Sequence, residues 1–346
     1  MLQVTFILDT VMSPTRKRRP TLQDIADLTG VTKMTVSRYL RDPQTVAEGT
    51  RERIAAAVEE LGYIPNRAPD ILSNATSRAI GILIPSLSNQ VFSAVIHGIE
   101  AVTRPAGYQT LLAHYGYSPE REEEQIASLL SYNVDGLILS DSRHTERTRK
   151  MIATAGIPVV ETMDLPPDPI DMVVGMDHKA AARAMVSEML RRGRRQVVYL
   201  GARLDVRTQL RMEGYYQAIQ DFGLTGQHLL TEQSSTFTLG GELLDQALAR
   251  YPDLDGIFCT NDDLAVGALL QCQSRWIPVP QQIAIAGSNA LDIGHAMTPK
   301  LASIVTPREE IGREAATMLL ARLGGKPPAE SRKDMGFTLY EGESLG

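Results

Sequence analysis

Residues 32–38 combine side chains that can read the edges of DNA bases. An arginine bonds guanine at two atoms, and lysine, serine and threonine offer further hydrogen bonds in the major groove. When a helix enters that groove, the residues of its first turns reach the bases. We therefore expect DNA contacts from Thr32, Lys33, Met34, Ser37 and Arg38. Arg38 is the best single candidate for a guanine contact.

Two short helices around a glycine are predicted to position these side chains. Thr21 and Asp24 have the spacing of a capping box, which predicts the start of a first helix. Gly30 ends that helix, and Thr32 can cap a second one, in which two apolar residues four positions apart pack inward. A third helix is predicted over residues 51–61. The pattern indicates a helix-turn-helix, although a helical hairpin without a DNA-binding role would share it.

The runs VTKMTVSRYL and TRERIAAAVEELGYIPNRAPDIL are similar to the headpiece and hinge of the lactose-repressor (LacI) family of bacterial transcription factors. The resemblance implies that Lys33, Met34 and Arg38 read bases. It also implies a hinge helix that begins at Asn66 and Arg67, and in which Leu72 wedges into the minor groove and bends the duplex. The neighbouring Pro69 and Asp70 depart from the family pattern, and a carboxylate near phosphates is unfavourable.

Charge is distributed unevenly along the chain. The whole sequence of 346 residues has a net charge of −6, whereas residues 13–67 carry ten basic and seven acidic residues, a net +3. An acidic body with one basic end is expected when only one domain meets phosphate. We expect the basic run at 16–19 to contact the DNA backbone.

Several other classes of protein fit poorly. The chain has no GxGxxG or GxxxxGK[ST] loop and its six histidines are scattered, so nothing favours an enzyme. Cys259 and Cys272 lie in apolar runs, and we expect reduced core thiols and no metal or cofactor. No stretch has the length of a membrane span, and the first eleven residues make a poor signal peptide. The prediction is a cytoplasmic, nucleoid-associated protein, with Met12 left open as an alternative start.

The rest of the chain predicts an α/β fold. Apolar runs such as AIGILIP, QTLLAHY, VDGLILS, IPVVE, VVYLG, DGIFCT and IAIAG suit buried parallel strands, and helices over 91–103 and 180–191 suit crossovers. This span resembles the two-lobed, doubly wound, periplasmic-binding-protein-like core of the same family. A periplasmic solute-binding protein would share that core, but it needs an export signal and no helix-turn-helix. The predicted parts are a flexible extension (1–19), the three-helix headpiece (20–64), the hinge and linker (65–77), and the effector-binding and dimerisation domain (78–346).

Polar residues follow the carboxyl ends of these strands, where ligands bind in such sheets. The candidate effector-binding residues are Ser86, Asn89, Phe92, His114, His144, Arg203, Arg207, Arg211, Asn261, Asp262 and Asn289. The resemblance implies that Arg211 holds ligand hydroxyls and that Asn261 and Asp262 form the edge of the pocket. Alternatives remain for two of them: Asp262 as a helix cap and His114 as a core histidine.

One departure from the family indicates the class of ligand. Where the family has glycine, an aromatic residue and two aspartates, this chain has Gly287, Ser288, Asn289 and Ala290. A carboxylate lost from a desolvated pocket favours an anionic ligand, and the nearby arginines do so too. Further phrases, among them GYQTLLAHYGY and LDGIFCTNDDLAVGA, resemble the gluconate-utilisation repressors of the family.

These observations predict a dimeric transcriptional repressor that binds double-stranded operator DNA and is released from it by a sugar acid. One headpiece reads too few base pairs, so two are expected on a near-palindromic operator. The end of the chain, GFTLYEGESLG, has no leucine heptads that would join two dimers. Gluconate, 6-phosphogluconate, idonate and ketogluconates all remain open as the effector. So does the alternative that the regulator answers to a neutral sugar or another metabolite, or to a corepressor protein.

Overall fold

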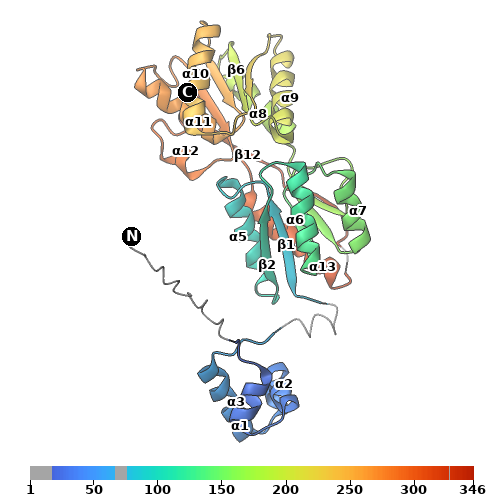
Figure 1. The fold of residues 1–346 in the computed structure, drawn as a ribbon. Coiled ribbons are helices and arrows are strands. Elements are labelled where there is room, and N and C mark those ends of the chain that lie inside the picture. Colours follow the sequence, from blue (N-terminus) through green and yellow to red (C-terminus); the bar gives the residue numbers. More distant parts are fainter. Residues whose placement is uncertain (1–17, 67–75, 327) are drawn as a thin grey trace, which may run out of the picture. The chain divides into compact units, whose positions relative to one another are not determined.

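A computed structural model describes residues 18–66, 76–326 and 328–346, and its contacts divide the chain into two units, residues 1–75 and 76–346. Figure 1 shows both units as ribbons. The predicted hinge residues Arg67 and Leu72, and the basic residues Arg16 and Lys17, lie outside the described residues.

The first unit contains the predicted helix-turn-helix. Its elements are α1 (Leu22–Thr29), α2 (Lys33–Arg41), the short 3-10 helix η1 (Pro43–Thr45) and α3 (Glu48–Leu61). Thr21 starts α1 through a capping box, because its backbone N–H donates to the Asp24 carboxylate at 2.7 Å. Gly30 ends α1 in the left-handed conformation, with φ at 69°. The third helix begins three residues before its predicted start.

The headpiece core forms where the three helices meet. Ile25 of α1, Val36 of α2 and Ile54 of α3 are completely buried, and Tyr63 closes the cluster after α3. Because Val36 points into this core, the residues on the other side of α2 face outward. The small core therefore fixes which face of α2 is presented.

Two sheets, one wholly and one mainly parallel, build the second unit, with one sheet in each of two lobes (Figure 1). In the first lobe the order is β11-β5-β4-β3-β1-β2 and all strands are parallel. The strands are β1 (Ala79–Ile84), β2 (Gln109–His114), β3 (Gly136–Leu139), β4 (Val159–Met163), β5 (Met172–Gly175) and β11 (Arg332–Asp334). The helices are α5 (Val91–Thr103), α6 (Pro119–Ser131), α7 (Glu146–Ala155) and α13 (Arg308–Leu323).

The second lobe repeats this plan with the order β12-β10-β9-β8-β6-β7, in which only β12 is antiparallel to its neighbour. Its strands are β6 (Val197–Ala202), β7 (Gln227–Thr231), β8 (Gly256–Cys259), β9 (Ala284–Ser288), β10 (Ala302–Val305) and β12 (Thr338–Tyr340). Its helices are α8 (His178–Arg191), α9 (Val206–Asp221), α10 (Phe237–Arg250), α11 (Asp262–Ser274) and α12 (Asp292–Ala296). Within the described residues the chain passes between the lobes after β5, β10 and β11.

The predicted α/β class and doubly wound core are confirmed, with one local correction. The run QTLLAHY was expected to be a buried strand, but β2 is the edge strand of its sheet and is only partly covered. Leu112, in the middle of β2, is 46% exposed. Its apolar residues resemble those of a central strand because one face still packs on α6.

Candidate functional site

The outer face of α2 presents unpaired cationic side chains. Lys33, Met34 and Arg38 are exposed, and Met34 is 72% exposed despite being apolar. The side chains of Lys33 and Arg38 make no hydrogen bond or ion pair within the described residues, whereas the side chain of Arg53 donates to the Thr29 carbonyl at 3.2 Å. The free cations are therefore on the side of α2 that faces away from the core.

The other sequence candidates of the headpiece differ in their roles. Thr32 caps α2, since its Oγ1 accepts from the Thr35 N–H at 3.2 Å. Ser37 is half-buried and lines a shallow surface hollow beside Arg38. Asn66 is exposed at the end of the described headpiece. The side chains that could contact bases therefore lie on the exposed face of α2 and at its N-terminal cap.

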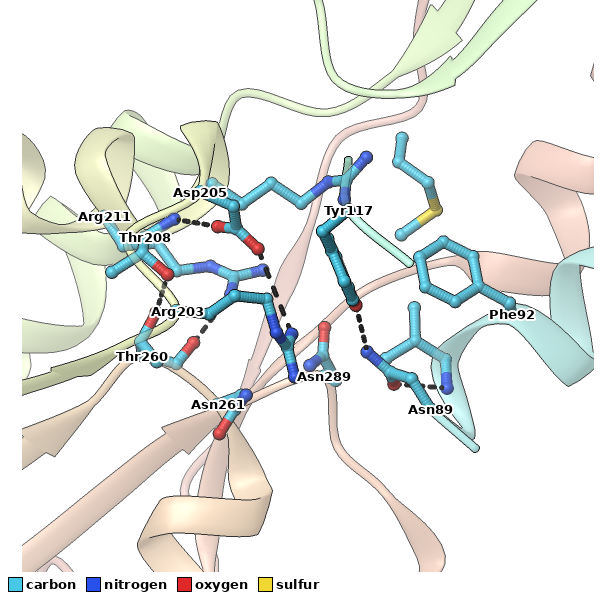
Figure 2. A pocket seen from close by; sticks show the side chains of 13 residues that line it. Asn89, Phe92, Tyr117, Arg203, Asp205, Thr208, Arg211, Thr260, Asn261 and Asn289 are labelled. Atoms are coloured by element: carbon cyan, nitrogen blue, oxygen red, sulfur yellow. Dashed lines mark hydrogen bonds and ion pairs between the residues drawn. The ribbon is translucent and has the colours of Figure 1, made fainter. Parts of the chain in front are cut away.

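A second candidate site is a pocket between the two lobes of residues 76–346 (Figure 2). Its cavity volume is about 30 Å³, below the usual range for small-molecule sites, so the lining side chains nearly fill it in this conformation. The lining residues come from strand ends and helix starts of both lobes. They are Asn89, Val91, Phe92, Tyr117, Met163, Arg203, Asp205, Arg207, Thr208, Arg211, Thr260, Asn261 and Asn289.

One lining arginine joins the lobes from behind the pocket. Arg207 of α9 donates from Nε to Asp164 Oδ1 at 2.9 Å and from Nη2 to the Ser140 carbonyl at 2.6 Å, and both acceptors belong to the first lobe. Burial alone would raise the pKa of Asp164, but Arg207 and His178 lower it to about 2. Asp164 therefore stays ionised and holds Arg207 in place.

A buried histidine extends this network to a second arginine. His178 Nε2 lies 3.2 Å from Asp164 Oδ1, and its Nδ1 lies 3.3 Å from Arg211 Nη2. Burial lowers the pKa of His178, and the positive charges of Arg211 and Arg207 lower it further. A neutral imidazole fits these contacts, because Nδ1 then accepts from Arg211 while Nε2–H donates to Asp164. Arg211 also donates to the Thr260 carbonyl at 2.6 Å.

Comparisons with known proteins assign both units. Residues 77–335 match the model of "Periplasmic binding proteins and sugar binding domain of LacI family", and residues 21–66 match "Bacterial regulatory proteins, lacI family". The chain belongs to the LacI family of bacterial transcriptional regulators. It is therefore a DNA-binding transcriptional repressor, with an α/β core of the kind that binds small-molecule effectors.

Individual relatives cover nearly the whole chain. It is 57% identical to the HTH-type transcriptional regulator GntR of Escherichia coli strain K12 over 330 residues, which are 95% of this chain and all of that protein. It is 50% identical to the regulator IdnR of the same strain over 95% of this chain and all of IdnR. A solved LacI-family regulator from Silicibacter pomeroyi has a TM-score of 0.89 and 35% identity, covering 94% of this chain and 99% of that one.

The structure brings most of the predicted effector residues of this LacI-family chain into one pocket. Seven of the eleven candidates line it, namely Asn89, Phe92, Arg203, Arg207, Arg211, Asn261 and Asn289. The other six lining residues are not among the eleven candidates, namely Val91, Tyr117, Met163, Asp205, Thr208 and Thr260. Tyr117 follows the end of β2 by three residues, so a longer window after that strand would have included it. Met163 ends β4 and is itself apolar, so it gave no polar signal.

Four of the candidates are placed outside the pocket lining. Ser86 stabilises a turn, where its Oγ accepts from the Ser88 N–H at 3.2 Å. His114 is exposed at the end of the edge strand β2. His144 is fully buried between Glu122 Oε1 at 2.9 Å and Glu161 Oε1 at 3.3 Å.

Asp262, the fourth of these, is completely buried at the start of α11. Its carboxylate accepts from the Leu291 N–H and from Ser303 Oγ, each at 2.6 Å, so it holds the turn that carries Asn289. Burial raises the pKa of Asp262 to about 6. The cap of α11 is Asn261, whose Oδ1 accepts from the Leu264 N–H at 3.2 Å. Asp262 thus supports the pocket wall from behind.

The described residues offer no alternative metal or membrane site. No group of three or more histidine, cysteine, aspartate or glutamate side chains is arranged to hold a metal ion in the described ranges. Within the same residues, no helix combines the length and the apolar character needed to cross a bilayer.

Proposed function

We propose that this repressor controls genes of gluconate or related sugar-acid catabolism and leaves its operator when a sugar acid binds between the lobes. The observation that carries the proposal is the charge of the pocket. Arg203, Arg207 and Arg211 line it, but Asp205 is the only carboxylate among the thirteen described lining residues. Positive charge stays in excess when the ionised Asp164 behind Arg207 is counted as well, and such an excess in a partly desolvated site favours an anion.

Asn289 supports the same conclusion. It is 5% exposed and lines the pocket at a position where the family pattern places an acid. Its Oδ1 lies 3.4 Å from Thr306 Oγ1, and its backbone has a φ of 110°. Because asparagine tolerates positive φ better than most residues, it can occupy this turn without adding a charge. The similarity to gluconate-utilisation repressors agrees with an acidic effector.

The DNA side of the proposal rests on α2 and on symmetry. Thr32, Lys33, Met34, Ser37 and Arg38 would contact the major groove, with Asn66, Arg67 and Leu72 in the hinge. Two copies of the chain would bind the two halves of an operator, and the repressor would act in the cytoplasm. The effector would change the relative positions of the lobes and thereby the affinity for DNA.

The test is a calorimetric and thermal-shift panel on the purified protein. We expect gluconate, 6-phosphogluconate, idonate or a ketogluconate to bind more tightly than glucose or ribose, because only the acids can pair with the cationic pocket. An acid at a hundred times its dissociation constant should raise the free energy of unfolding by about 2.7 kcal/mol.

The matched variant is Asn289→Asp, which keeps the size of the side chain and its acceptor oxygen toward Thr306. This substitution should weaken the binding of the acids more than the binding of the neutral sugars, since the new carboxylate repels an anion. Tightest binding of glucose or ribose, with gluconate affinity unchanged in Asn289→Asp, would contradict the sugar-acid proposal. The assignment to the LacI family would stand in that case.

A further inference from the structure

The three arginines of the pocket differ in how many of their donors are already used. Arg207 donates from Nε to the Asp164 carboxylate and from Nη2 to the Ser140 carbonyl, and its side chain is only 11% exposed. A ligand anion at Arg207 would have to compete with a buried carboxylate 2.9 Å away. Arg207 therefore links the two lobes and is poorly placed to bind a second negative charge.

Arg211 uses only some of its hydrogen-bond donors within the protein. Its Nη1 donates to the Thr260 carbonyl and its Nη2 to His178 Nδ1, while its Nε is buried without a hydrogen-bond partner among the described residues. Two of the five N–H groups of this guanidinium are therefore used, and Arg211 keeps fewer donors than Arg203 for the two parallel bonds by which a guanidinium grips a carboxylate.

Arg203 has the fewest hydrogen-bond partners of the three arginines. No hydrogen bond from this side chain to another described residue is present, and its Nε is buried without a partner. The nearest ion pair joins Nη1 to Asp205 Oδ2 at 4.0 Å, and that aspartate already caps α9 through a 2.8 Å bond from the Thr208 N–H. Asp263 is the other acid whose charge interacts with Arg203. An unpartnered buried donor is costly unless a ligand satisfies it.

Tyr117 of the other lobe positions Arg203. The Arg203 guanidinium carbon lies 4.3 Å from the centre of the Tyr117 ring, and Asn89 Nδ2 lies 3.3 Å from the Tyr117 hydroxyl. Figure 2 shows the Arg203 side chain pointing toward Tyr117 and Asn289. Stacking leaves the edge of the guanidinium plane, where its N–H groups point, open to an acceptor.

The backbone of Arg203 is also strained. Arg203 and the following Leu204 have φ values of 68° and 51°, a region that residues other than glycine seldom adopt. A backbone bond from the Arg203 N–H to the Gln233 carbonyl at 2.9 Å anchors the turn. Strain that the surroundings maintain in this way is typical of ligand-binding positions.

We propose that Arg203 is the residue that recognises the carboxylate of the effector, while Arg211 binds a neighbouring oxygen and Arg207 only joins the lobes. The inference rests on the proposed sugar-acid function and assigns its specificity to one side chain. Because Arg203 is stacked on Tyr117 of the opposite lobe, binding of the carboxylate is coupled to closure of the lobes.

The experiment compares gluconate with gluconamide, which replaces the carboxylate by a neutral amide of similar shape. Isothermal titration calorimetry of the full-length protein measures both affinities for the wild type, Arg203→Met and Arg203→Lys. Arg203→Met should weaken the binding of gluconate roughly 100-fold and that of gluconamide only severalfold, because the lost ion pair is charge-assisted. The gluconate affinity of Arg203→Lys should lie between those of the wild type and Arg203→Met, since lysine keeps the charge and loses the planar guanidinium.

Two further variants separate recognition from folding and from general charge. Arg183→Met removes an exposed arginine of the same lobe, which pairs with Asp221, and should leave both affinities unchanged. Tyr117→Leu should weaken gluconate more than Tyr117→Phe does, because only the phenyl ring keeps the stacking. Unliganded melting temperatures of all variants show that the pocket is still folded.

The outcomes distinguish the two levels of the proposal. If the wild type binds gluconate but Arg203→Met loses gluconate and gluconamide equally, the assignment of the carboxylate to Arg203 is wrong and the sugar-acid function stands. If no sugar acid binds the wild type, both fail. If Arg207→Met, rather than Arg203→Met, removes the preference for gluconate over gluconamide, the roles of the two arginines are reversed.

Discussion

Arginines that look equivalent in the sequence acquire different roles from their partners. The motif RLDVRTQLR places three of them within nine residues, and sequence reasoning treated them as one cationic cluster. The structure separates them, because Asp164 and Ser140 take the donors of Arg207 and leave those of Arg203 free. Asp164 lies 43 positions away in the sequence and gave no signal of this pairing. Local pattern thus predicted the charge of the site, while tertiary contacts decide which charge is available.

The base-reading role of Arg38 can be tested with a single substitution. Arg38→Ala should reduce affinity for the operator by about 1 to 3 kcal/mol, because a bidentate contact to guanine is lost. Affinity for random DNA at the same salt concentration should fall less. Fluorescence anisotropy on both DNAs gives the ratio, and an equal loss on both would mean that Arg38 contacts only phosphate.

His144 should make stability dependent on pH. Burial would lower its pKa, but the carboxylates of Glu122 and Glu161 raise it to about 9. A raised histidine pKa stabilises the folded state fully below the unfolded value of about 6.5, and this stabilisation is lost as pH rises toward 9. Its contribution is on the order of 3 kcal/mol. Denaturant unfolding of the wild type between these pH values should show the decline.

In His144→Gln this part of the decline should disappear, and gluconate affinity should be nearly unchanged because the side chain does not line the pocket. His97→Gln is the matched control, since His97 is exposed and lies 3.5 Å from Glu309. A wild-type pH profile retained in His144→Gln would show that another group is responsible.

At the scale of elements, the sequence located helices better than sheet edges. The prediction for residues 91–103 coincides with α5, and those for β1, β3, β6, β8 and β9 fall on the observed strands. Apolar runs do not say which strand lies at an edge, so β2 was taken as buried. The strands β11 and β12 have three residues each and pair with distant parts of the chain, so no local pattern marks them.

Close packing of α10 on α11 requires a glycine at Gly240 but not at its neighbour Gly241. A Cβ at Gly240 would lie 2.3 Å from the Leu264 carbonyl oxygen, whereas one at Gly241 would lie 3.4 Å from Gln271 Cβ, an ordinary contact. Gly240→Ala should therefore destabilise the protein by about 1 to 3 kcal/mol. Gly241→Ala should be neutral or stabilise by up to about 1 kcal/mol, because alanine favours the helix.

Chemical denaturation of the two variants provides the comparison. Gly240→Ala should also weaken effector binding, since α11 begins beside Asn261 of the pocket. Similar stabilities of the two variants would mean that the helices can separate without cost.

At the scale of the whole molecule, the pocket exists only because two lobes meet. The sequence predicted polar residues at the strand ends of each lobe, and seven of those chosen share one cavity. Contacts across the cleft, such as Arg203 on Tyr117 and Arg207 on Asp164, depend on how far the lobes close. The degree of closure between the lobes is set by the balance of many weak contacts, and no sequence motif predicts that balance.

Coupling between the pocket and the headpiece must be reciprocal. If gluconate weakens operator binding by some factor, operator must weaken gluconate binding by the same factor, because both ligands act on one conformational equilibrium. We expect anisotropy with labelled operator, at zero and saturating gluconate, to give a factor of about 5 to 150. Titration of gluconate into free and operator-bound protein should give the same factor.

The stoichiometry tests the dimer in the same titrations. Two chains of 37.9 kDa should bind one operator and two molecules of gluconate. Random DNA at equal concentration is the control, and it should change gluconate affinity less than operator does, because it does not engage both headpieces in register. Because this reciprocity holds at any site, a gluconate affinity that operator leaves unchanged would mean that the gluconate site measured in the titration is not the site through which operator is released.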